Sequence, residues 1–268
     1  MQSLLIRYSD NSFNALENSL KSLGEDCSVE LVHSLRLNIK KIRALITAID
    51  YKGDSLNDIL IFKRIDSFFI RLGYLRDGHV QMILLEFYRK RVGEEVDGIV
   101  DYINRGKKKI NKSIEKKIRK INIFDIILLN QRFDETIESL DNEKIEEKVQ
   151  QKVDLLFNQI VQLTSDDLGE EVLHRIRKLI KELIYIFSTI KKAKMNTKYN
   201  SSFTLFLNTL QQKLGRWHDL SVLVELINEI DSCSGRSKNL LQVVEYDKRV
   251  IQMEIAGDLR KLRDFNSM

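Results

Sequence analysis

Residues 32–49 read VHSLRLNIKKIRALITAI, a stretch in which basic and apolar side chains recur with the period of an α-helix. At about 100° per residue, four of its basic side chains fall in one sector roughly 80° wide. They are His33, Arg36, Lys40 and Arg43. Leucines and isoleucines occupy the opposite side. The pattern predicts a helix with one apolar face and one basic face.

The same pattern recurs 141 residues later, where residues 173–181 read LHRIRKLIK. The repeated basic side chains, in matching order, are those of His174, Arg177 and Lys181. Two positions differ between the copies: Glu182 replaces Lys41, and Ile184 replaces Arg43. We therefore interpret the chain as an internal duplication in which the second copy is the less basic one.

A leucine–glycine motif follows each copy, with its glycine 40 or 41 residues after the histidine. Residues 72–77 read LGYLRD, and residues 214–219 read LGRWHD. Arg76 and His218 hold equivalent positions in the two motifs, so a hydrogen-bond donor of either kind suits that position. The repetition of both motifs in the same order strengthens the interpretation as a duplication.

The two glycines of these motifs are expected to end helices. Gly73 and Gly215 hold the same repeat position, and a left-handed glycine is the commonest helix C-terminal cap. Asp77 and Asp219 would then lie in the first turn of the next helix, where a carboxylate suits the macrodipole. A second role remains open to both aspartates, which could hold basic side chains in place through charge-assisted hydrogen bonds.

Composition predicts a globular, all-α protein. The chain has 268 residues, of which 43% are hydrophobic and 31% are charged, and this balance excludes a disordered chain. It contains no proline, which fits long helices with short connections. The formal net charge of +5 is modest for a nucleic-acid-binding protein, so the placement of the charges matters more than their sum.

Helical periodicity runs along most of the chain, and strand-like alternation is convincing nowhere. We predict helices near residues 10–22, 29–50, 55–72, 75–91, 94–120, 133–163, 168–191, 199–214, 217–231 and 238–264. We expect a single domain over residues 1–268, with a first repeat at 10–125 and a second at 130–266. A helix across Asp134–Gln151 would join the two repeats.

Cysteine usage and hydropathy point to a cytoplasmic protein. Cys27 and Cys233 have no paired spacing, so a disulfide framework is not expected. Residues 1–10 lack the apolar core of a signal peptide. No apolar run approaches the ~18 residues of a membrane span. We therefore expect no membrane partner.

The repeated basic face favours an anion-binding site. A lone histidine on a helix is more often a structural residue, but here two histidines share a face with an arginine at +3 and a lysine at +7. A metal site is disfavoured, because cations surround each histidine and neither HExxH nor CxxC occurs. We expect neither a metal nor any other cofactor.

Several other residues have simpler interpretations. His79 has Ser221 as its repeat counterpart, so we treat this histidine as structural. Lys107–Lys120 reads as a solvated helix face, with extension of a positive surface as the alternative. Trp217 and Phe203 are expected in the core.

Together, the motifs resemble those of the CHAD family, the conserved histidine α-helical domain. The resemblance extends over roughly residues 10–264. The matching residues are His33, Arg36, Lys40, Lys41, Arg43, Arg76, Asp77, His174, Arg177, Lys181, His218 and Asp219. Glu182 and Ile184 depart from the pattern, where the family prefers basic residues. The ExExK signature of the CYTH triphosphatase domain, to which some members are fused, does not occur in this chain.

The resemblance implies two four-helix bundles related by a pseudo-twofold axis, packed around a basic central cleft or pore. It also implies binding of inorganic polyphosphate and association with polyphosphate granules. We predict binding by His33, Arg36, Lys40, Lys41, Arg43, Arg71, Arg76, His174, Arg177, Lys181, Lys213 and His218, supported by Asp77 and Asp219. Because the charge of histidine depends on pH, we expect tighter binding near pH 6 than near pH 8.

Three other functions stay open. A nucleic-acid-binding module would share the basic face, but no aromatic stacking surface or groove-reading helix is recognisable. A phosphohydrolase or polyphosphate kinase would need carboxylates for Mg²⁺ or a glycine-rich phosphate loop, and neither accompanies the basic motifs. We therefore expect no catalytic residue. Inositol polyphosphates or nucleotides could use the same cleft.

Overall fold

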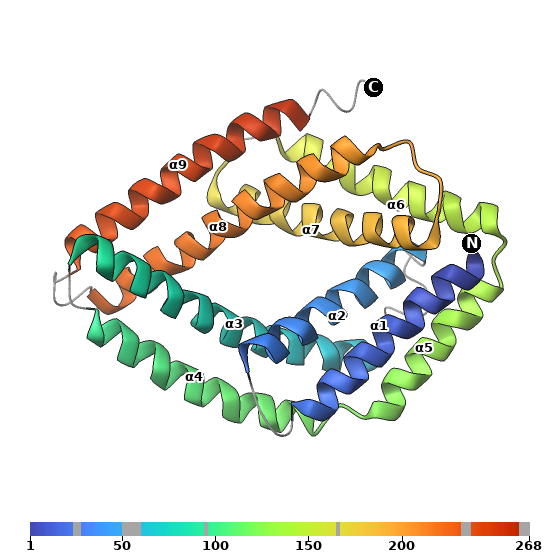
Figure 1. Cartoon of the computed structure of the whole chain (residues 1–268), viewed down its shortest axis with the longest axis horizontal. Coiled ribbons are helices and arrows are strands. Elements are labelled where there is room, and N and C mark those ends of the chain that lie inside the picture. The colour runs from blue at the N-terminus through green and yellow to red at the C-terminus, as the bar shows by residue number, and fades with distance from the viewer. Residues whose placement is uncertain (24–27, 50–59, 94–95, 165–166, 232–236, 263–268) are drawn as a thin grey trace.

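The computed structural model describes the whole chain except residues 24–27, 50–59, 94–95, 165–166, 232–236 and 263–268. Its described residues form nine α-helices and no strand, which confirms the predicted all-α class (Figure 1). The helices are α1 (Gln2–Ser22), α2 (Val29–Ile49), α3 (Leu60–Val92), α4 (Asp97–Ile118), α5 (Ile123–Glu138), α6 (Asn142–Leu163), α7 (Glu170–Ala193), α8 (Ser201–Asp231) and α9 (Lys238–Leu262). Both cysteines lie outside the described residues.

The helix with the second basic motif, α7, shows why these segments are helical. Glu170 and Glu171 lie in its first turn, and Lys191 and Lys192 in its last, so both ends complement the macrodipole. Lys194 then closes the helix in the left-handed conformation, and its backbone N–H donates to the carbonyl of Ile190. The buried residues of α7 follow helical spacing along one stripe.

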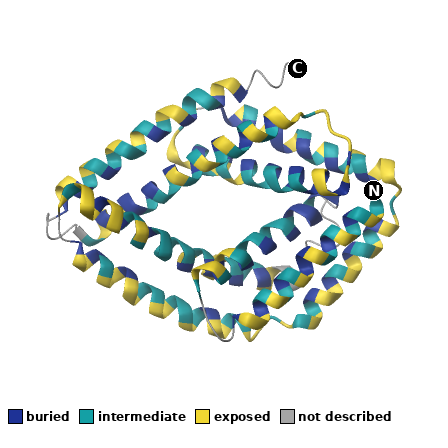
Figure 2. Cartoon of the chain, in the orientation of Figure 1, coloured by how far each residue is buried: buried dark blue, intermediate teal, exposed yellow. Residues whose placement is uncertain are grey.

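The two copies of the basic motif pack against each other. Helix α2 contacts α7, and α3 contacts α8, so contacts cross between the copies (Figure 1). Each of these helices also packs on a chain neighbour: α1 on α2, α3 on α4, α6 on α7, and α8 on α9. Figure 2 shows buried residues where the helices face one another and exposed residues on their outer sides. The predicted apolar positions Ile39 and Ile180, for example, are almost fully buried.

The prediction that Gly73 and Gly215 end helices is wrong. Helices α3 and α8 run through these positions without a break, and the only described glycine with positive φ is Gly93. Asp77 and Asp219 are therefore mid-helix residues, and the predicted first-turn role is wrong as well. A mid-helix glycine costs only about 1 kcal/mol. Burial on both sides of it, at Leu72 for instance, offsets that cost.

The predicted single helix over residues 133–163 is two helices. Asp141 separates them as the N-cap of α6, where its carboxylate accepts a hydrogen bond from the backbone N–H of Lys144 at 2.8 Å. Helix α5 begins earlier than predicted, after Asn122 caps it by accepting from the N–H of Phe124 at 3.0 Å. Because α5 spans residues 123–138, it crosses the predicted boundary between the repeats.

Candidate functional site

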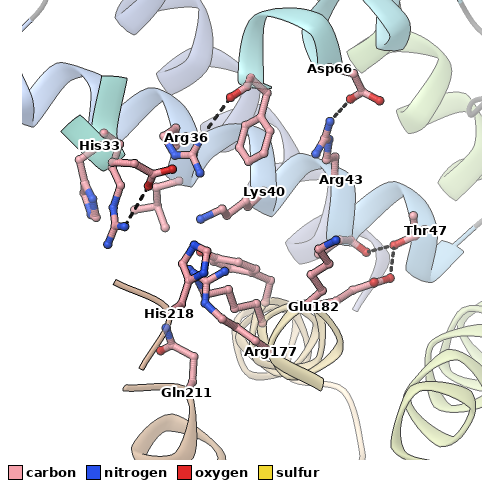
Figure 3. Close-up of a pocket in the computed structure, with 18 residues that line it drawn as sticks. His33, Arg36, Lys40, Arg43, Thr47, Asp66, Arg177, Glu182, Gln211 and His218 are labelled. Atoms are coloured by element: carbon pink, nitrogen blue, oxygen red, sulfur yellow. Dashed lines mark hydrogen bonds and ion pairs between the residues drawn. The ribbon is translucent and has the colours of Figure 1, made fainter. Parts of the chain in front are cut away.

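A pocket of about 630 Å³ lies between α2, α3, α7 and α8, the four helices that carry the repeated motifs (Figure 3). Its volume falls within the usual range for ligand sites. Its arginine and lysine lining residues are Arg36, Lys40, Arg43, Arg76, Arg177, Lys178 and Lys181. The lining carboxylates are Asp66, Asp77 and Glu182. Positive side chains therefore outnumber negative ones by more than two to one.

Both copies of the duplication contribute equivalent positions to the pocket. The equivalent lining pairs are Arg36 and Arg177, Leu37 and Lys178, Lys40 and Lys181, Ala44 and Tyr185, Phe69 and Gln211, and Arg76 and His218. The two members of each pair are 141 residues apart on α2 and α7, and 142 apart on α3 and α8. The repeat seen in the sequence therefore corresponds to two walls of one pocket.

Nine of the fourteen predicted site residues line this pocket. They are His33, Arg36, Lys40, Arg43, Arg76, Asp77, Arg177, Lys181 and His218. The other five, which are not among the lining residues, are Lys41, Arg71, His174, Lys213 and Asp219. Lys213, His174 and Asp219 have other contacts that account for their positions.

Lys213 is engaged with α9 instead of the pocket. Its ammonium group lies 2.7 Å from a carboxylate oxygen of Asp258 and 3.4 Å from one of Glu254.

His174 lies behind the pocket wall, where its ring packs 4.9 Å from the ring of Trp217 and 5.0 Å from that of His218. Trp217 and Phe203 are buried, which confirms their predicted place in the core.

Asp219 supports the pocket by holding Arg76. Its two carboxylate oxygens accept hydrogen bonds from Nη1 of Arg76 at 2.6 Å and from Nη2 at 3.2 Å. Asp77 accepts a further bond from Nη1 at 3.2 Å. Burial alone would lower the pKa of Arg76, but the bonds to Asp219 and Asp77 raise it above its ordinary value. This bidentate pair fixes the guanidinium and links α3 to α8.

Arg36 is held at the pocket wall by the backbone and an aromatic ring. Its Nη1 donates to the carbonyl of Phe69 at 3.0 Å, and its guanidinium carbon lies 4.4 Å from the centroid of the Phe69 ring. Burial, together with the nearby charges of Arg76 and Arg177, lowers the pKa of Arg36 to about 10. The guanidinium therefore stays charged at neutral pH, in a fixed orientation.

The centre of the pocket holds cations that form no ion pair with a described carboxylate, although the ammonium of Lys40 lies 5.9 Å from the ring centroid of Phe69. Lys40, Arg177 and Lys181 line it without an ion pair to any described carboxylate. Burial and neighbouring arginines lower the pKa of Lys40 to about 7, and that of Lys181 to about 6. Burial also lowers the pKa of Arg177, whose Nε is buried without a hydrogen-bond partner. Without a bound anion, the protonated forms of Lys40 and Lys181 are therefore disfavoured.

His218 faces this group of cations as a neutral ring. Burial, followed by the charge of Arg177, lowers the pKa of His218 to about 3, and its Nδ1 has no partner. Burial lowers the pKa of His174 as well. Burial therefore disfavours protonation of His218 near pH 6, and we expect the lysines to contribute the larger part of the pH dependence.

Charges are balanced at the end of the pocket farthest from His33 (Figure 3). Arg43 pairs with Asp66, and its guanidinium carbon lies 4.5 Å from the ring centroid of Phe69. Glu182 accepts a hydrogen bond from Thr47 at 3.2 Å and lies 2.8 Å from the ammonium of Lys152. Glu182 is one of the two positions at which the second copy departs from the first.

Sequence reasoning missed four lining residues that helical spacing could have found. Lys178 lies beside Arg177 within the quoted motif, and Tyr185 follows Lys181 by four residues on the same face of α7. The other two are Phe69 and Gln211, each seven residues before the motif donor on its helix. Because Phe69 and Gln211 hold equivalent positions in the two repeats, the repeat itself could have indicated that both face the pocket.

The two repeat-equivalent glycines differ in what surrounds them, and this yields a matched test. An alanine Cβ at Gly73 would stand 2.9 Å from Nη1 of Arg36, whereas at Gly215 it would meet nothing within 4 Å. We expect Gly215→Ala to raise the free energy of unfolding by about 0.5–1 kcal/mol, because alanine is the better helix former. Anion affinity should not change in this variant.

Gly73→Ala should stabilise the helix less, because the new methyl group displaces the Arg36 guanidinium. We expect anion affinity to fall about tenfold, the value of roughly one charged hydrogen bond. Thermal unfolding and calorimetric titration of both variants would check these expectations. Equal affinity of the two variants would show that the position of Arg36 is not set by the space at Gly73.

The remaining features of the chain lie elsewhere. His79 and the Lys107–Lys120 segment do not line the pocket. No group of three or more His, Cys, Asp or Glu side chains within the described ranges could hold a metal ion. None of the described helices is both long and apolar enough to cross a membrane.

Comparison with known proteins adds a family and a fold. The family profile of the CHAD domain matches residues 7–228. A crystal structure of the CHAD domain from the plant Ricinus communis superposes with a TM-score of 0.65, at 18% sequence identity. The superposition covers 98% of this chain and 90% of the plant chain. No match was found among curated proteins.

Proposed function

This chain belongs to the CHAD family, and on that premise we propose that it binds inorganic polyphosphate in the basic pocket without hydrolysing it. The family is associated with polyphosphate binding in general. The proposal assigns this ligand to a defined pocket and to named side chains. Those side chains are Arg36, Lys40, Arg43, Arg76, Arg177, Lys181 and His218, with His33 at the pocket edge.

The lining chemistry suits a polymer of phosphates. Polyphosphate carries about one negative charge per phosphate and has no bases to be read, so a binder needs dense positive charge and no sequence discrimination. Arginines can contact phosphate oxygens in bidentate fashion, and lysines add mobile point charges. Mounting these side chains on four packed helices lowers the ordering cost of binding.

The observation that carries the proposal is the group of unpaired cations at the pocket centre. Lys40, Arg177 and Lys181 are largely withdrawn from water, and besides burial the charge of Arg177 lowers the pKa of both lysines. Buried like charges destabilise the empty protein unless something neutralises them. A polyanion would supply that neutralisation, so the arrangement favours binding of a ligand with several negative charges.

The nucleic-acid alternative finds less support in the pocket. Single-stranded nucleic acids bind to open aromatic faces on which bases stack. Phe69 and Tyr185 line the pocket, and the guanidinium groups of Arg36 and Arg43 lie 4.4 and 4.5 Å from the ring centroid of Phe69. The Phe69 ring is therefore occupied, which leaves Tyr185 as a single aromatic side chain among the cations rather than a row of stacking surfaces.

The enzymatic alternative finds less support as well. Phosphoryl transfer relies on carboxylates that hold Mg²⁺. The three lining carboxylates instead contact basic side chains of the protein: Asp77 contacts Arg76, Asp66 contacts Arg43, and Glu182 contacts Lys152. We therefore propose no catalytic residue.

Two further proposals concern the arrangement of the two repeats and the location of the protein in the cell. We propose that the two copies form pseudo-symmetric helical bundles around the pocket, because equivalent positions of both copies line it. We also propose that the protein acts in the cytoplasm and associates with polyphosphate granules. Retention of a fluorescent fusion on granules, and its loss when the pocket arginines are replaced, would support this location.

Calorimetric titration with long-chain polyphosphate tests the proposed function. We expect tight binding of polyphosphate, and a single-stranded oligonucleotide of similar charge should compete for the pocket only poorly. Incubation with Mg²⁺ or Mn²⁺ should release no phosphate from the polymer. Absence of polyphosphate binding would overturn the proposal, and phosphate release above a no-protein control would replace it with an enzymatic function.

A further inference from the structure

Helix α4 carries a second concentration of positive charge, outside the pocket. Residues 105–120 contain nine lysines and arginines and a single acidic residue, Glu115. Five of these cations project from one exposed face within about 100° of each other. We call them the α4 stripe: Arg105, Lys108, Lys109, Lys112 and Lys116. Exposed residues run along the outer side of α4 in Figure 2.

The α4 stripe differs from the other solvated faces of this protein. Elsewhere, exposed helices mix charges of both signs, as in the pairs Glu17 with Lys21 and Glu86 with Lys90. In the part of the chain that the structure describes, the one ion pair that reaches α4 joins Asp97 to Arg89, away from the stripe. Like charges four residues apart destabilise a helix. Solubility alone does not require a helix face on which charges of one sign are gathered.

The stripe lies one helix away from the pocket. Helix α3 packs on α4 and is the wall that the two features share. Arg76 and Asp77 of α3 line the pocket, while the next residue, Gly78, faces α4, where a Cβ would stand 3.2 Å from Cγ of Lys107. Lys107 and the buried Ile103 and Ile114 lie about 150–170° around α4 from the centre of the stripe, so the stripe faces away from α3. A polymer that leaves the pocket over α3 must therefore also pass over α4 to reach the stripe.

The pocket reaches solvent at its His33 end. His33 lines the pocket and is exposed. It lies 14 residues from Thr47 on the same helix, so the two mark points about 21 Å apart. At the Thr47 end, Asp66 and Glu182 balance the local positive charge. The field therefore draws a polyanion toward the centre and the His33 end.

We propose that the α4 stripe is a second contact site for the polyphosphate chain held in the pocket, reached by the part of the polymer that leaves beside His33. This inference rests on the proposed function of the pocket. Two linked contact regions on one polymer act as a multivalent site, in which the second contact forms at a high effective concentration. The stripe would therefore give preference for long chains without affecting short ones.

The chemistry of α4 favours this partner over a membrane or a nucleic acid. A membrane-surface helix needs an exposed apolar face, but Ile99, Ile103 and Ile114 of α4 are buried within the protein. Single-stranded nucleic acid needs aromatic stacking surfaces. The exposed aromatic side chain of α4, Tyr102, donates a hydrogen bond from its hydroxyl to Glu229 at 2.6 Å and lies outside the stripe.

The test compares two triple variants with equal loss of charge. The stripe variant is Lys108→Gln/Lys112→Gln/Lys116→Gln, and the matched control is Lys191→Gln/Lys192→Gln/Lys238→Gln, three exposed lysines away from α4. Each is titrated with tripolyphosphate and with long-chain polyphosphate over a series of salt concentrations. Circular dichroism checks that the helical content of both matches the wild type.

In the stripe variant, we expect tripolyphosphate affinity to stay at the wild-type value and long-chain affinity to fall about 10- to 100-fold. The slope of log affinity against log salt for the long chain should become shallower by about 2, because three contacts of roughly 0.7 each are lost. The control should match the wild type in both titrations. These results together would support the second contact site.

Equal long-chain affinities of the stripe and control variants would overturn the inference and leave the pocket proposal intact. The same conclusion would follow if the wild type bound tripolyphosphate and the long chain with the same salt slope. Failure of the wild type to bind either ligand would instead remove the proposed function, and the inference with it.

Discussion

Replacing Arg36 and Arg177 by glutamine is expected to weaken binding of long-chain polyphosphate at least about 100-fold. The two guanidinium groups are repeat-equivalent and face the same pocket from α2 and α7. A hydrogen bond to a charged group contributes about 1.5–3 kcal/mol, so two such contacts amount to about 3 kcal/mol or more. Glutamine keeps some donor capacity and volume while removing the charge. Calorimetric titration at moderate salt measures the loss.

The matched control for this double variant is Arg7→Gln/Arg132→Gln, which removes the same charge from two exposed positions outside the pocket. We expect this control to bind nearly as tightly as the wild type. The pocket variant should also show a salt slope shallower by about 1.4, from two lost contacts. If both variants lose affinity equally, the effect comes from net charge, and the pocket is not the binding site.

The second large effect should come from pH. Lys40 and Lys181 have a pKa of about 7 and about 6 in the empty protein, so most of their positive charge is absent at pH 8. A polyanion that needs both charges must bind together with protons. We expect affinity for polyphosphate to be at least about tenfold higher at pH 6 than at pH 8, measured in matched salt.

Two variants identify the titrating groups. Lys40→Arg/Lys181→Arg should retain binding and lose most of the pH dependence, because an arginine in this pocket stays protonated at both pH values, as the pKa of about 10 for Arg36 indicates. His218→Asn should leave the pH dependence unchanged, since burial keeps this histidine neutral. A flat profile in the histidine variant would return the role to histidine protonation.

The same lysines should make the empty protein more stable as pH rises. Their pKa in the folded chain lies below the ordinary value of 10.5, so the unfolded chain binds more protons between about pH 6 and 10. The free energy of unfolding then increases with pH across that window. Thermal unfolding at pH 6 and pH 9 should show this trend in the wild type and a weaker one in Lys40→Met/Lys181→Met. An equal trend in both would assign it to other groups.

The helical class and half of the lining residues, nine of eighteen, could be predicted because both depend on local periodicity. A basic stripe opposite an apolar stripe fixes which side of α2 is buried and which side faces the pocket, as Ile39 and Lys40 show. The duplication then indicates that the second copy does the same. Nothing in this reasoning required knowledge of the tertiary structure.

The errors came from features that only packing decides. Gly73 and Gly215 looked like helix ends, but buried neighbours keep α3 and α8 continuous. Asp219 has the second of the two roles that the sequence left open, because it holds Arg76 across two helices in a contact between residues 143 positions apart. Lys213 pairs with Asp258 of α9 and does not line the pocket. No local sequence pattern predicts this contact between α8 and α9.

Because the two walls of the pocket belong to one chain, a substitution changes one wall and leaves the other as it was. In a dimer of identical subunits, every substitution would appear on both sides of a twofold axis. Here Arg43 lines the pocket on one wall, Ile184 holds its counterpart position, and Glu182 lines the pocket where Lys41 does not. The two ends of the pocket therefore differ, and the two orientations in which a linear molecule could bind are not equivalent in energy.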